Sequence, residues 1–338
     1  MRLTRRQFAK LLPASGLALA VPDRPAQAQI QAAEAPDVGP TVTLVMAGDV
    51  MLADLPGESI ARGIDPFAEF ADVLNGADLA VGNLECVVSD KGAKVDKSYN
   101  FRADPKTLPL LAKYFDGVSL ANNHSGDFGK EAFADCVDRL ERAKIGFFGG
   151  GRNFEEAHRP LVLERKGVKI ALLGYDEFRP QSFEAGPDTP GVAWSLGDAY
   201  EARVLADITA ARSDRGVELV IPFMHWGWEG YPSNVRQESF ARRMIDAGAD
   251  VVVGGHPHVT QGFDSYKGKL IVYSLGNFVF DNYDDGRKGW LLRLTLGKRG
   301  LVRWDTVVLR TDAQGTPHPV PDASSPRGRV VEGKVTAS

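Results

Sequence analysis

The stretch Val251-Val252-Val253-Gly254-Gly255-His256-Pro257-His258 decides the fold class, because an apolar run ends in glycines and then in ligand-capable side chains. A short run of β-branched residues bounded by glycine is typical of a buried strand in a parallel sheet. In open α/β sheets, ligands bind beyond the carboxyl ends of the strands. The stretch therefore predicts an α/β protein with a site at one edge of its sheet.

The same pattern recurs along the chain. The apolar runs that we interpret as strands are 41–47, 78–82, 117–121, 168–174, 218–224, 250–254 and 270–274. Helical periodicity lies between them, over 130–143 and around Val204 and Met244. Strands that alternate with helices predict an α/β architecture. Residues 290–296 and 301–309 predict a closing antiparallel pair.

Polar groups follow several of these runs directly. They are Asp49, Asn83, Glu85, Asn123, His124, Asp127, His225, His256, His258 and Asn277. One histidine after a strand is usually a structural hydrogen-bonding group, and one aspartate there is often a helix N-cap. The combination is more informative, since four of the six histidines occupy such positions. Histidines, carboxylates and a carboxamide form a mixed N/O ligand set that suits Zn, Mn, Fe or Co better than Ca or Mg.

Six candidate ligands exceed the four that one tetrahedral zinc needs. They are Asp49, Glu85, Asn123, His225, His256 and His258. Two divalent transition-metal ions, bridged by a carboxylate and sharing an acidic water, would use such a set better. We therefore predict a centre of two ions, Zn, Mn or Fe.

The N-terminal segment is typical of an export signal. Arg5-Arg6-Gln7-Phe8 precedes an apolar stretch, and Ala26-Gln27-Ala28 offers a small-x-small cleavage site. Residues 1–28 therefore resemble a twin-arginine signal peptide, which predicts contact with that export machinery and a periplasmic or extracellular location. The alternative is a basic tail with an apolar helix. Elsewhere no run approaches the ~20 apolar residues that span a bilayer, so we expect no transmembrane segment in the mature chain.

Composition bounds the partners and the domain organisation. The net charge of −4 and the pI of about 5.9, without a long basic run, predict no nucleic-acid binding. Residues 29–40 are interpreted as a flexible lead-in, 41–311 as one domain and 312–338 as a loose C-terminal tail. Cys86 and Cys136 form a disulfide or stay two separate buried thiols.

The motifs together resemble a known family. They are Gly48-Asp49-Val50-Met51, Asn83-Leu84-Glu85, Ala121-Asn122-Asn123-His124-Ser125-Gly126-Asp127, His225-Trp226-Gly227, Gly255-His256-Pro257-His258 and Tyr273-Ser274-Leu275-Gly276-Asn277-Phe278. In this order they resemble the CapA family of capsule and poly-γ-glutamate synthesis, within the calcineurin-like metallophosphoesterases. The resemblance implies a four-layer α/β/β/α sandwich with a dinuclear metal centre between the sheets.

The resemblance also implies roles for individual residues. Asp49 corresponds to the first aspartate ligand, and Glu85, or alternatively Asn83, replaces the bridging carboxylate. Asn123 and the later histidines correspond to ligands, whereas His124 corresponds to the catalytic histidine, whose ring Asp127 orients. Two departures stand out. Met51 occupies the place of a family histidine, and Gly82-Asn83-Leu84-Glu85 replaces the Gly-Asp-x-x-Asp-Arg motif.

Three functions follow as hypotheses. The first is a metal-dependent hydrolase or transferase that acts on an anionic polymer of the cell envelope, such as γ-linked polyglutamate. The alternatives are a non-catalytic, metal-containing module that binds or exports the polymer, and a phosphoesterase. The candidate substrate-binding residues are Arg102, Lys97, Trp226 and Asn277. For these the competing interpretations are solvated charge for Arg102 and Lys97, core packing for Trp226, and support of a turn for Asn277.

Overall fold

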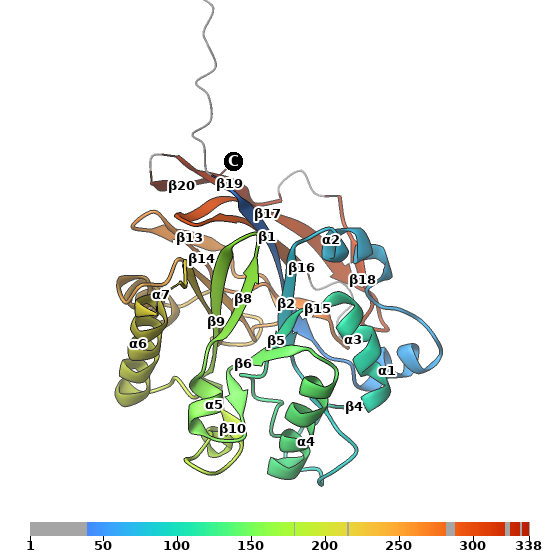
Figure 1. The fold of residues 1–338 in the computed structure, drawn as a ribbon. Helices are drawn as coiled ribbons and strands as arrows, with labels where there is room; N and C mark the ends of the chain where they lie inside the picture. Colours follow the sequence, from blue (N-terminus) through green and yellow to red (C-terminus); the bar gives the residue numbers. More distant parts are fainter. Residues whose placement is uncertain are drawn as a thin grey trace, which may run out of the picture. The chain divides into compact units, whose positions relative to one another are not determined.

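The structure is a computed structural model, and it describes residues 39–178, 180–214, 216–281, 288–321, 325–331 and 333–337. Residues 1–38, with the predicted signal peptide and most of the lead-in, lie outside the described residues. Two large sheets make up the body of the fold (Figure 1). In the described part of the chain, no helix is long and apolar enough to cross a membrane.

The first sheet follows the order β20-β19-β17-β16-β1-β2-β5-β6. Its strands are β1 (Thr41–Val50), β2 (Leu79–Leu84), β5 (Gly117–Ser119), β6 (Gly146–Phe148), β16 (Lys288–Gly297), β17 (Gly300–Thr311), β19 (Arg327–Val331) and β20 (Lys334–Ala337). β15 (Asn277–Val279) pairs with β1, and β18 (Pro317–Pro319) pairs with β17. β1, β2, β5 and β6 are mutually parallel, so their carboxyl ends share one edge.

The second sheet follows the order β13-β14-β12-β11-β9-β8. Its strands are β8 (Leu161–Arg165), β9 (Val168–Asp176), β11 (Leu219–His225), β12 (Val251–Gly255), β13 (Phe263–Tyr266) and β14 (Lys269–Val272). β9, β11, β12 and β14 are parallel. Two short pairs, β3 (Val87–Val88) with β4 (Arg102–Ala103) and β7 (Gly150–Gly151) with β10 (Gly191–Val192), complete the strands.

Helices cover the outer faces of both sheets. They are α1 (Asp54–Ala61), α2 (Ala71–Asn75), α3 (Leu108–Tyr114), α4 (Gly129–Arg142), α5 (Phe154–His158), α6 (Asp198–Ser213) and α7 (Val235–Asp246), with 3₁₀ turns at Ala68–Phe70, Pro105–Thr107 and Gln181–Phe183. Figure 1 shows α6 and α7 on one side and α1, α3 and α4 on the other. α4 buries Phe133, Val137 and Leu140, one helical face, as its periodicity predicts.

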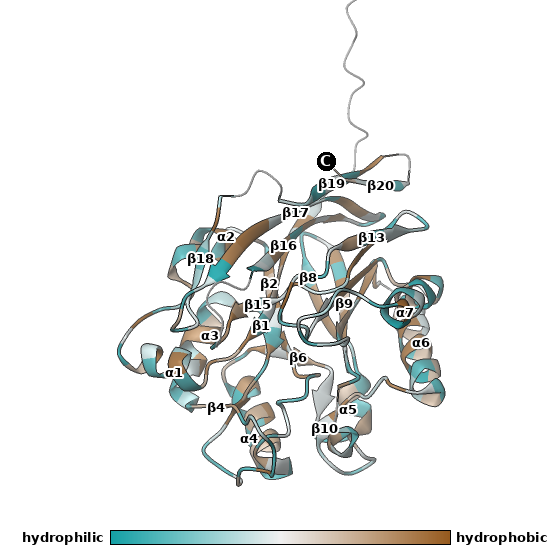
Figure 2. Ribbon diagram, turned by 180° about the vertical axis from the view of Figure 1, so that it is seen from behind, coloured by the Kyte–Doolittle hydropathy of each residue, from teal (hydrophilic) through white to brown (hydrophobic). Residues whose placement is uncertain are grey.

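Three apolar cores separate four layers. One packs α1–α4 on the first sheet, with Val45, Phe115 and Leu140 among its members. The second lies between the sheets and includes Leu44 and Ile221, while the third packs α6 and α7 on the second sheet. In Figure 2 much of β17 is hydrophobic, whereas α7 carries a hydrophilic face. The structure therefore confirms the α/β/β/α sandwich.

The C-terminal part differs from the expected loose tail. β18, β19 and β20 form after Thr311, so that prediction is wrong for these segments. The exposed edge of β17 provides unpaired backbone groups with which β18 and β19 make hydrogen bonds. Val330 and Val335 also pack against the core between the sheets. The predicted antiparallel pair at 290–309 is confirmed as β16 and β17.

Candidate metal centre

The strand ends bring the predicted ligands together. Asp49 in β1 is paired in register with Asn83 of β2 and with Asn277 of β15. His225 ends β11, and His256 directly follows β12. A Cβ at Gly255 would lie only 2.8 Å from Asp49 Oδ1, so glycine at this position lets the second sheet approach the first.

Asn83 lies between two carboxylates of the centre. Its Nδ2 atom donates to Asp49 Oδ1 at 2.9 Å and to Glu85 Oε2 at 3.1 Å. Its own Oδ1 accepts a hydrogen bond from Asn122 Nδ2 at 3.0 Å. Asn83 therefore orients both acidic groups, and its own oxygen is engaged by Asn122, whereas Glu85 has an unpartnered oxygen, which favours Glu85 over Asn83 as the ligand.

Glu85 Oε1 carries the main geometric signal for a cation. This oxygen is buried and has no hydrogen-bond partner among the described residues. It lies 3.8 Å from His225 Nε2, 3.9 Å from His258 Nε2 and 4.0 Å from His124 Nε2. Two atoms that each lie about 2.0–2.2 Å from one ion can be up to about 4.4 Å apart. The spacing is too long for hydrogen bonds, and for His225 and His258 it suits atoms that share a cation with Glu85.

The ligand-capable atoms fall into overlapping sets, each with its atoms within 4.8 Å of one another. One set is Glu85, His225 and His256, and another is Asp49, Glu85 and His258. Asn123 Oδ1 lies 2.8 Å from His225 Nε2 and thus adjoins the first set. Glu85 is therefore common to both sets.

His256 is held in a strained backbone conformation. Its φ is +94° and that of His258 is +56°, in the left-handed region that non-glycine residues rarely adopt. The ring of Phe178 lies against His256 with centroids 3.9 Å apart. His256 Nε2 is a second buried atom that lacks a hydrogen-bond partner among the described residues. Strain of this kind clusters at functional sites.

The electrostatics of the buried groups also favour a cation. Burial raises the pKa of Glu85 well above its usual value, and the nearby Asp49 raises it further. Burial lowers the pKa values of His225 and His256 well below 6.5, and the neighbouring His258 adds to this effect. Neutral imidazoles are the form that binds metals. For His258, hydrogen bonding and attraction to Asp49 outweigh burial and raise its pKa.

His124 and Asp127, which the sequence predicts as a catalytic pair, lie in contact. His124 Nδ1 lies 2.6 Å from Asp127 Oδ2, so its Nε2 atom faces Glu85. Burial lowers the pKa of His124, although Asp127 opposes this effect. The Phe101 ring stacks on His124 with centroids 4.2 Å apart, and the Phe101 amide donates to Asp127 Oδ2. The Phe101 ring and backbone amide therefore hold the His124–Asp127 pair in its orientation.

The four predicted substrate-binding residues have different environments. Lys97 Nζ contacts Asp127 Oδ1 and the Asn123 carbonyl oxygen, inside the centre. Arg102 is exposed, its guanidinium lies over the Phe128 ring, and its Nη1 donates to the Lys91 carbonyl oxygen at 3.1 Å, away from the candidate ligands. Asn277 Oδ1 lies 2.8 Å from His258 Nδ1, so Asn277 orients a candidate ligand.

The prediction that Trp226 binds substrate is wrong. Its side chain is 0% exposed in the core under α6 and α7, and its Nε1 donates to the Tyr273 carbonyl oxygen at 2.8 Å. Consecutive residues of an extended segment point to opposite faces. Because His225 faces the centre, Trp226 faces the core. Trp228 and Tyr231, which follow it, are 66% and 67% exposed.

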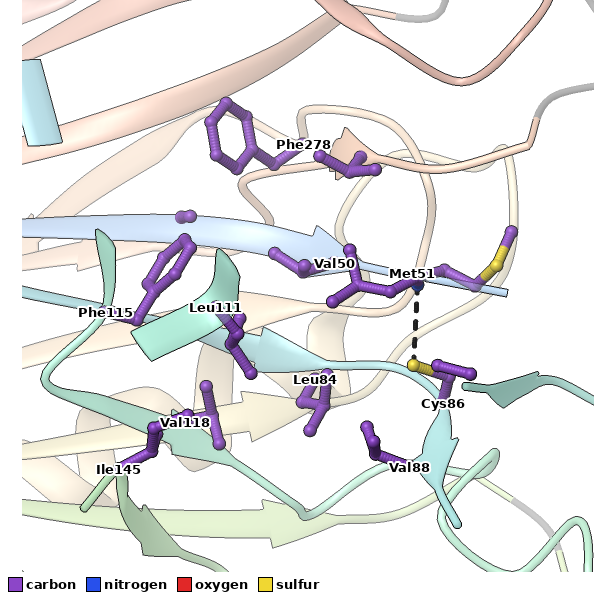
Figure 3. Close-up of a cluster of buried hydrophobic side chains, with 14 of the residues drawn as sticks. Val50, Met51, Leu84, Cys86, Val88, Leu111, Phe115, Val118, Ile145 and Phe278 are labelled. Atoms are coloured by element: carbon purple, nitrogen blue, oxygen red, sulfur yellow. Dashed lines mark hydrogen bonds between the residues drawn. The ribbon is translucent and has the colours of Figure 1, made fainter. Parts of the chain in front are cut away.

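Met51 and Cys86 lie in the core beside the centre rather than in it. Both are fully or almost fully buried among apolar side chains, as Figure 3 shows. Met51 Sδ accepts a hydrogen bond from the Ala53 amide, and Cys86 Sγ accepts one from the Leu52 amide. Cys86 and Cys136 are both free thiols, which is the second of the two alternatives.

Two acidic residues near the centre escaped the sequence analysis. Asp176 ends β9 directly opposite His225, and burial raises its pKa well above the usual value. The apolar run 170–175 before it carries the same signal as the other strand ends. Glu229 lies close enough to His256 and His258 to form a third ligand set. It is an exposed loop residue, so no periodic pattern marks it.

The chain is similar to proteins whose names refer to the synthesis of capsule, PGA or polyglutamine. "Capsule biosynthesis protein CapA" of Bacillus anthracis is 33% identical over 300 residues, 83% of this chain and 70% of that protein. "PGA biosynthesis protein CapA" of Bacillus subtilis (strain 168) is 30% identical over 286 residues, 81% of this chain and 72% of that protein. A "Probable polyglutamine synthesis accessory protein" of Mycobacterium tuberculosis is 32% identical over 252 residues, covering 70% of this chain and 66% of its own.

A solved structure titled "Structure of PhoD" aligns with 88% of this chain and 72% of that chain, at 10% identity and a TM-score of 0.42. The profile of a family described as "Bacterial capsule synthesis protein PGA_cap" matches residues 43–282, which contain every candidate ligand. The chain therefore belongs to the PGA_cap family of bacterial capsule synthesis proteins, within the metallophosphoesterase-like superfamily.

Proposed function

We propose that this chain is an exported, metal-dependent hydrolase or transferase that acts on a γ-linked glutamyl polymer during capsule synthesis. The family and the names of the Bacillus relatives support the polymer and the process. The twin-arginine pattern at Arg5-Arg6 supports export through that machinery to the periplasm or the cell exterior. The fold alone does not determine a function, so the reaction is argued from the residues of the site.

The observation that carries the enzyme proposal is the unpaired Glu85 Oε1 among three imidazole nitrogens. A buried carboxylate oxygen without a partner is costly unless a cation neutralises it. Glu85, His225, His256 and Asn123 would hold one divalent ion, and Asp49, Glu85 and His258 a second. Ions of Zn, Mn or Fe suit this donor set, and when bound they supply an acidic water and stabilise negative charge.

The chain's own residues supply the acid–base chemistry. His124 Nε2 faces the centre, while Asp127 fixes the ring through Nδ1. His124 therefore exchanges a proton with the leaving group at Nε2, and Asp127 compensates the charge that develops on the ring. Lys97 Nζ donates to Asp127 Oδ1 at 2.8 Å and keeps this carboxylate in place. The same Nζ atom is itself held by the Asn123 carbonyl oxygen at 2.7 Å.

The test combines metal analysis with turnover. Protein purified without chelators should contain about two divalent ions per chain. His124→Ala should keep the metal and lose turnover of γ-linked polyglutamate, whereas His318→Ala, in β18, serves as the matched control. A wild-type protein that loads metal yet leaves γ-glutamyl polymers intact would contradict the enzyme proposal. Cleavage of phosphodiesters alone would identify a phosphoesterase instead.

A second candidate is a non-catalytic module that binds the polymer. Met51 supports it, because this residue packs in the core and offers no ligand where the superfamily has a histidine. The intact His124–Asp127 pair favours catalysis, since a binding module has no use for an oriented proton donor. Polymer binding without turnover, in a protein that holds metal, would be the result expected for this candidate.

A further inference from the structure

A surface depression of about 980 Å³ is lined by residues of β16, β17 and β19. These strands lie towards one edge of the first sheet (Figure 1). Four arginines line the depression, in a chain whose net charge is −4. They are Arg293, Arg303, Arg327 and Arg329. We call Arg303, Arg327 and Arg329 the arginine face.

The register of the strands puts these charges side by side. Arg303 of β17 lies directly opposite Arg329 of β19, and Asp305 lies opposite Arg327. Directly opposed residues of antiparallel strands share one face of the sheet, with Cβ atoms about 4.5–5.5 Å apart. Like charges at such positions destabilise a sheet. The repulsion between Arg303 and Arg329 therefore destabilises the sheet, and a bound anionic ligand would remove this destabilisation.

The one nearby carboxylate does not neutralise the arginine face. Asp305 is the only acidic side chain among the described residues that line the depression. Arg293 takes both of its oxygens, with Nη2 2.6 Å from Oδ1 and Nε 3.2 Å from Oδ2. Within the described part of the chain, Arg303, Arg327 and Arg329 have no ion-pair partner, and all three are exposed.

The arginine face is remote from the metal centre. Arg303 pairs with Thr295, which pairs with Thr43 of β1. Thr43 precedes Asp49 by six residues, and a strand rises about 3.3 Å per residue, so the two sites are about 20 Å apart along the strand direction alone. A small substrate bound at the centre cannot reach the arginine face, but a polymer can.

We propose that the arginine face binds a polycarboxylate chain and so holds the anionic polymer at a second point. Closely spaced guanidinium groups match repeating carboxylates, which arginine binds in a bidentate manner. Nucleic acid fits less well, since Trp304, the one aromatic residue of the lining, is 1% exposed and offers no ring on which a base could stack. The identity of the polymer rests on the proposed function, but the binding itself does not require turnover.

The test measures binding of fluorescent γ-linked polyglutamate to the full-length protein in EDTA, where the metal centre is inactive. Arg303→Gln/Arg329→Gln should weaken binding about tenfold and reduce the slope of log affinity against log salt by about two, one for each lost contact. Arg303→Lys/Arg329→Lys, which keeps the charge but loses the bidentate fork, should restore the salt slope and only part of the affinity. The matched control Arg62→Gln/Arg159→Gln removes two exposed charges elsewhere and should bind like the wild type.

Several results would overturn the proposal. They are an absence of polyglutamate binding by the wild type, an equal loss in the control, and an unchanged affinity in the glutamine variant that circular dichroism shows to be folded. Tighter binding of a DNA duplex or of anionic phospholipid vesicles through the same arginines would assign the face to another ligand. Polymer binding without turnover in metal-loaded protein would refute the enzyme proposal and leave this one standing.

Discussion

Lys97 Nζ lies 2.8 Å from Asp127 Oδ1, and this salt bridge holds the carboxylate that orients His124. Asp127 is 1% exposed and also accepts the Phe101 amide, so its charge is fully committed to the protein. Lys97 therefore contacts Asp127 from inside the site, whereas the sequence predicts a contact with substrate.

Lys97→Met should therefore destabilise the protein while leaving its metal in place. The variant keeps the aliphatic stem but leaves Asp127 as a buried charge without its cation, at a cost of about 2–4 kcal/mol. Turnover should fall about 10–100-fold, as expected when a group that orients a functional residue is lost. Urea denaturation and metal analysis measure the two effects. Lys94→Met, on the exposed part of the same loop, is the control, and equal stability of both variants would refute the role.

Glu85→Gln should change stability in opposite directions with and without metal. In EDTA, burial and Asp49 make the ionised Glu85 unfavourable, so the neutral amide should stabilise the protein by about 1–3 kcal/mol at pH 7. With metal present, the variant should be less stable than the wild type because it loses a charged ligand. Thermal unfolding in EDTA and in Zn²⁺ or Mn²⁺ checks both signs.

The pH dependence of the metal-free protein follows from the same group. The pKa of Glu85 is raised on folding, so the folded state keeps its proton longer than the unfolded state does. The resulting destabilisation is absent well below pH 4.5, grows as the pH rises from 4.5 towards the raised pKa, and is complete above it. In EDTA the wild type should lose stability over this range relative to Glu85→Gln. Parallel curves for the two proteins would show that Glu85 ionises freely.

Substitution of Trp226 should lower stability, whereas substitution of Trp228 should leave it unchanged. Trp226→Phe leaves the Tyr273 carbonyl without its donor inside the core and should cost about 1–3 kcal/mol of stability. Trp228→Ala, at a side chain that is 66% exposed, should stay within about 0.5 kcal/mol of the wild type. If Trp228 contacts the polymer, its loss raises KM without changing stability. A stable Trp226→Phe variant would contradict the core assignment.

The sequence predicts where Asp49, His225 and His256 lie because strand ends converge by a simple rule. Every apolar run that ends in Asp49, His225 or His256 is a strand in the structure, and these residues meet where the carboxyl ends of the two sheets come together. Trp226 shows where residue type misleads. Its aromatic character suggested a groove wall, whereas the alternation of side chains along the chain already placed it opposite His225.

Elements without a periodic signal could not be predicted. α1 contains Pro56 and Gly57, and α3 contains Pro109, residues that disfavour helix interiors and are tolerated here near the first turns. α5 is only five residues long, too short for a helical pattern. Such segments become helical because tertiary packing on the sheet, rather than propensity, stabilises them.

The C-terminal strands β18, β19 and β20 should contribute to the stability of the fold, although composition alone predicts a loose tail. Removal of residues 312–338 would expose the edge of β17, which pairs with β18 and β19, and would uncover the apolar core next to Val330 and Val335. It would also break the contact between His318 Nδ1 and Glu69 Oε1 at 2.7 Å, which ties β18 to the 3₁₀ turn at Ala68–Phe70.

We expect the truncated protein to be less stable by about 2–5 kcal/mol and to aggregate, because an open edge of a long strand recruits other chains. Thermal unfolding and light scattering measure both effects. Removal of residues 333–337 alone, which takes away only the outermost strand β20, is the milder control and should leave the protein monomeric. A truncation at Thr311 that unfolds like the intact chain would show that these strands contribute nothing to the fold, as the composition had implied.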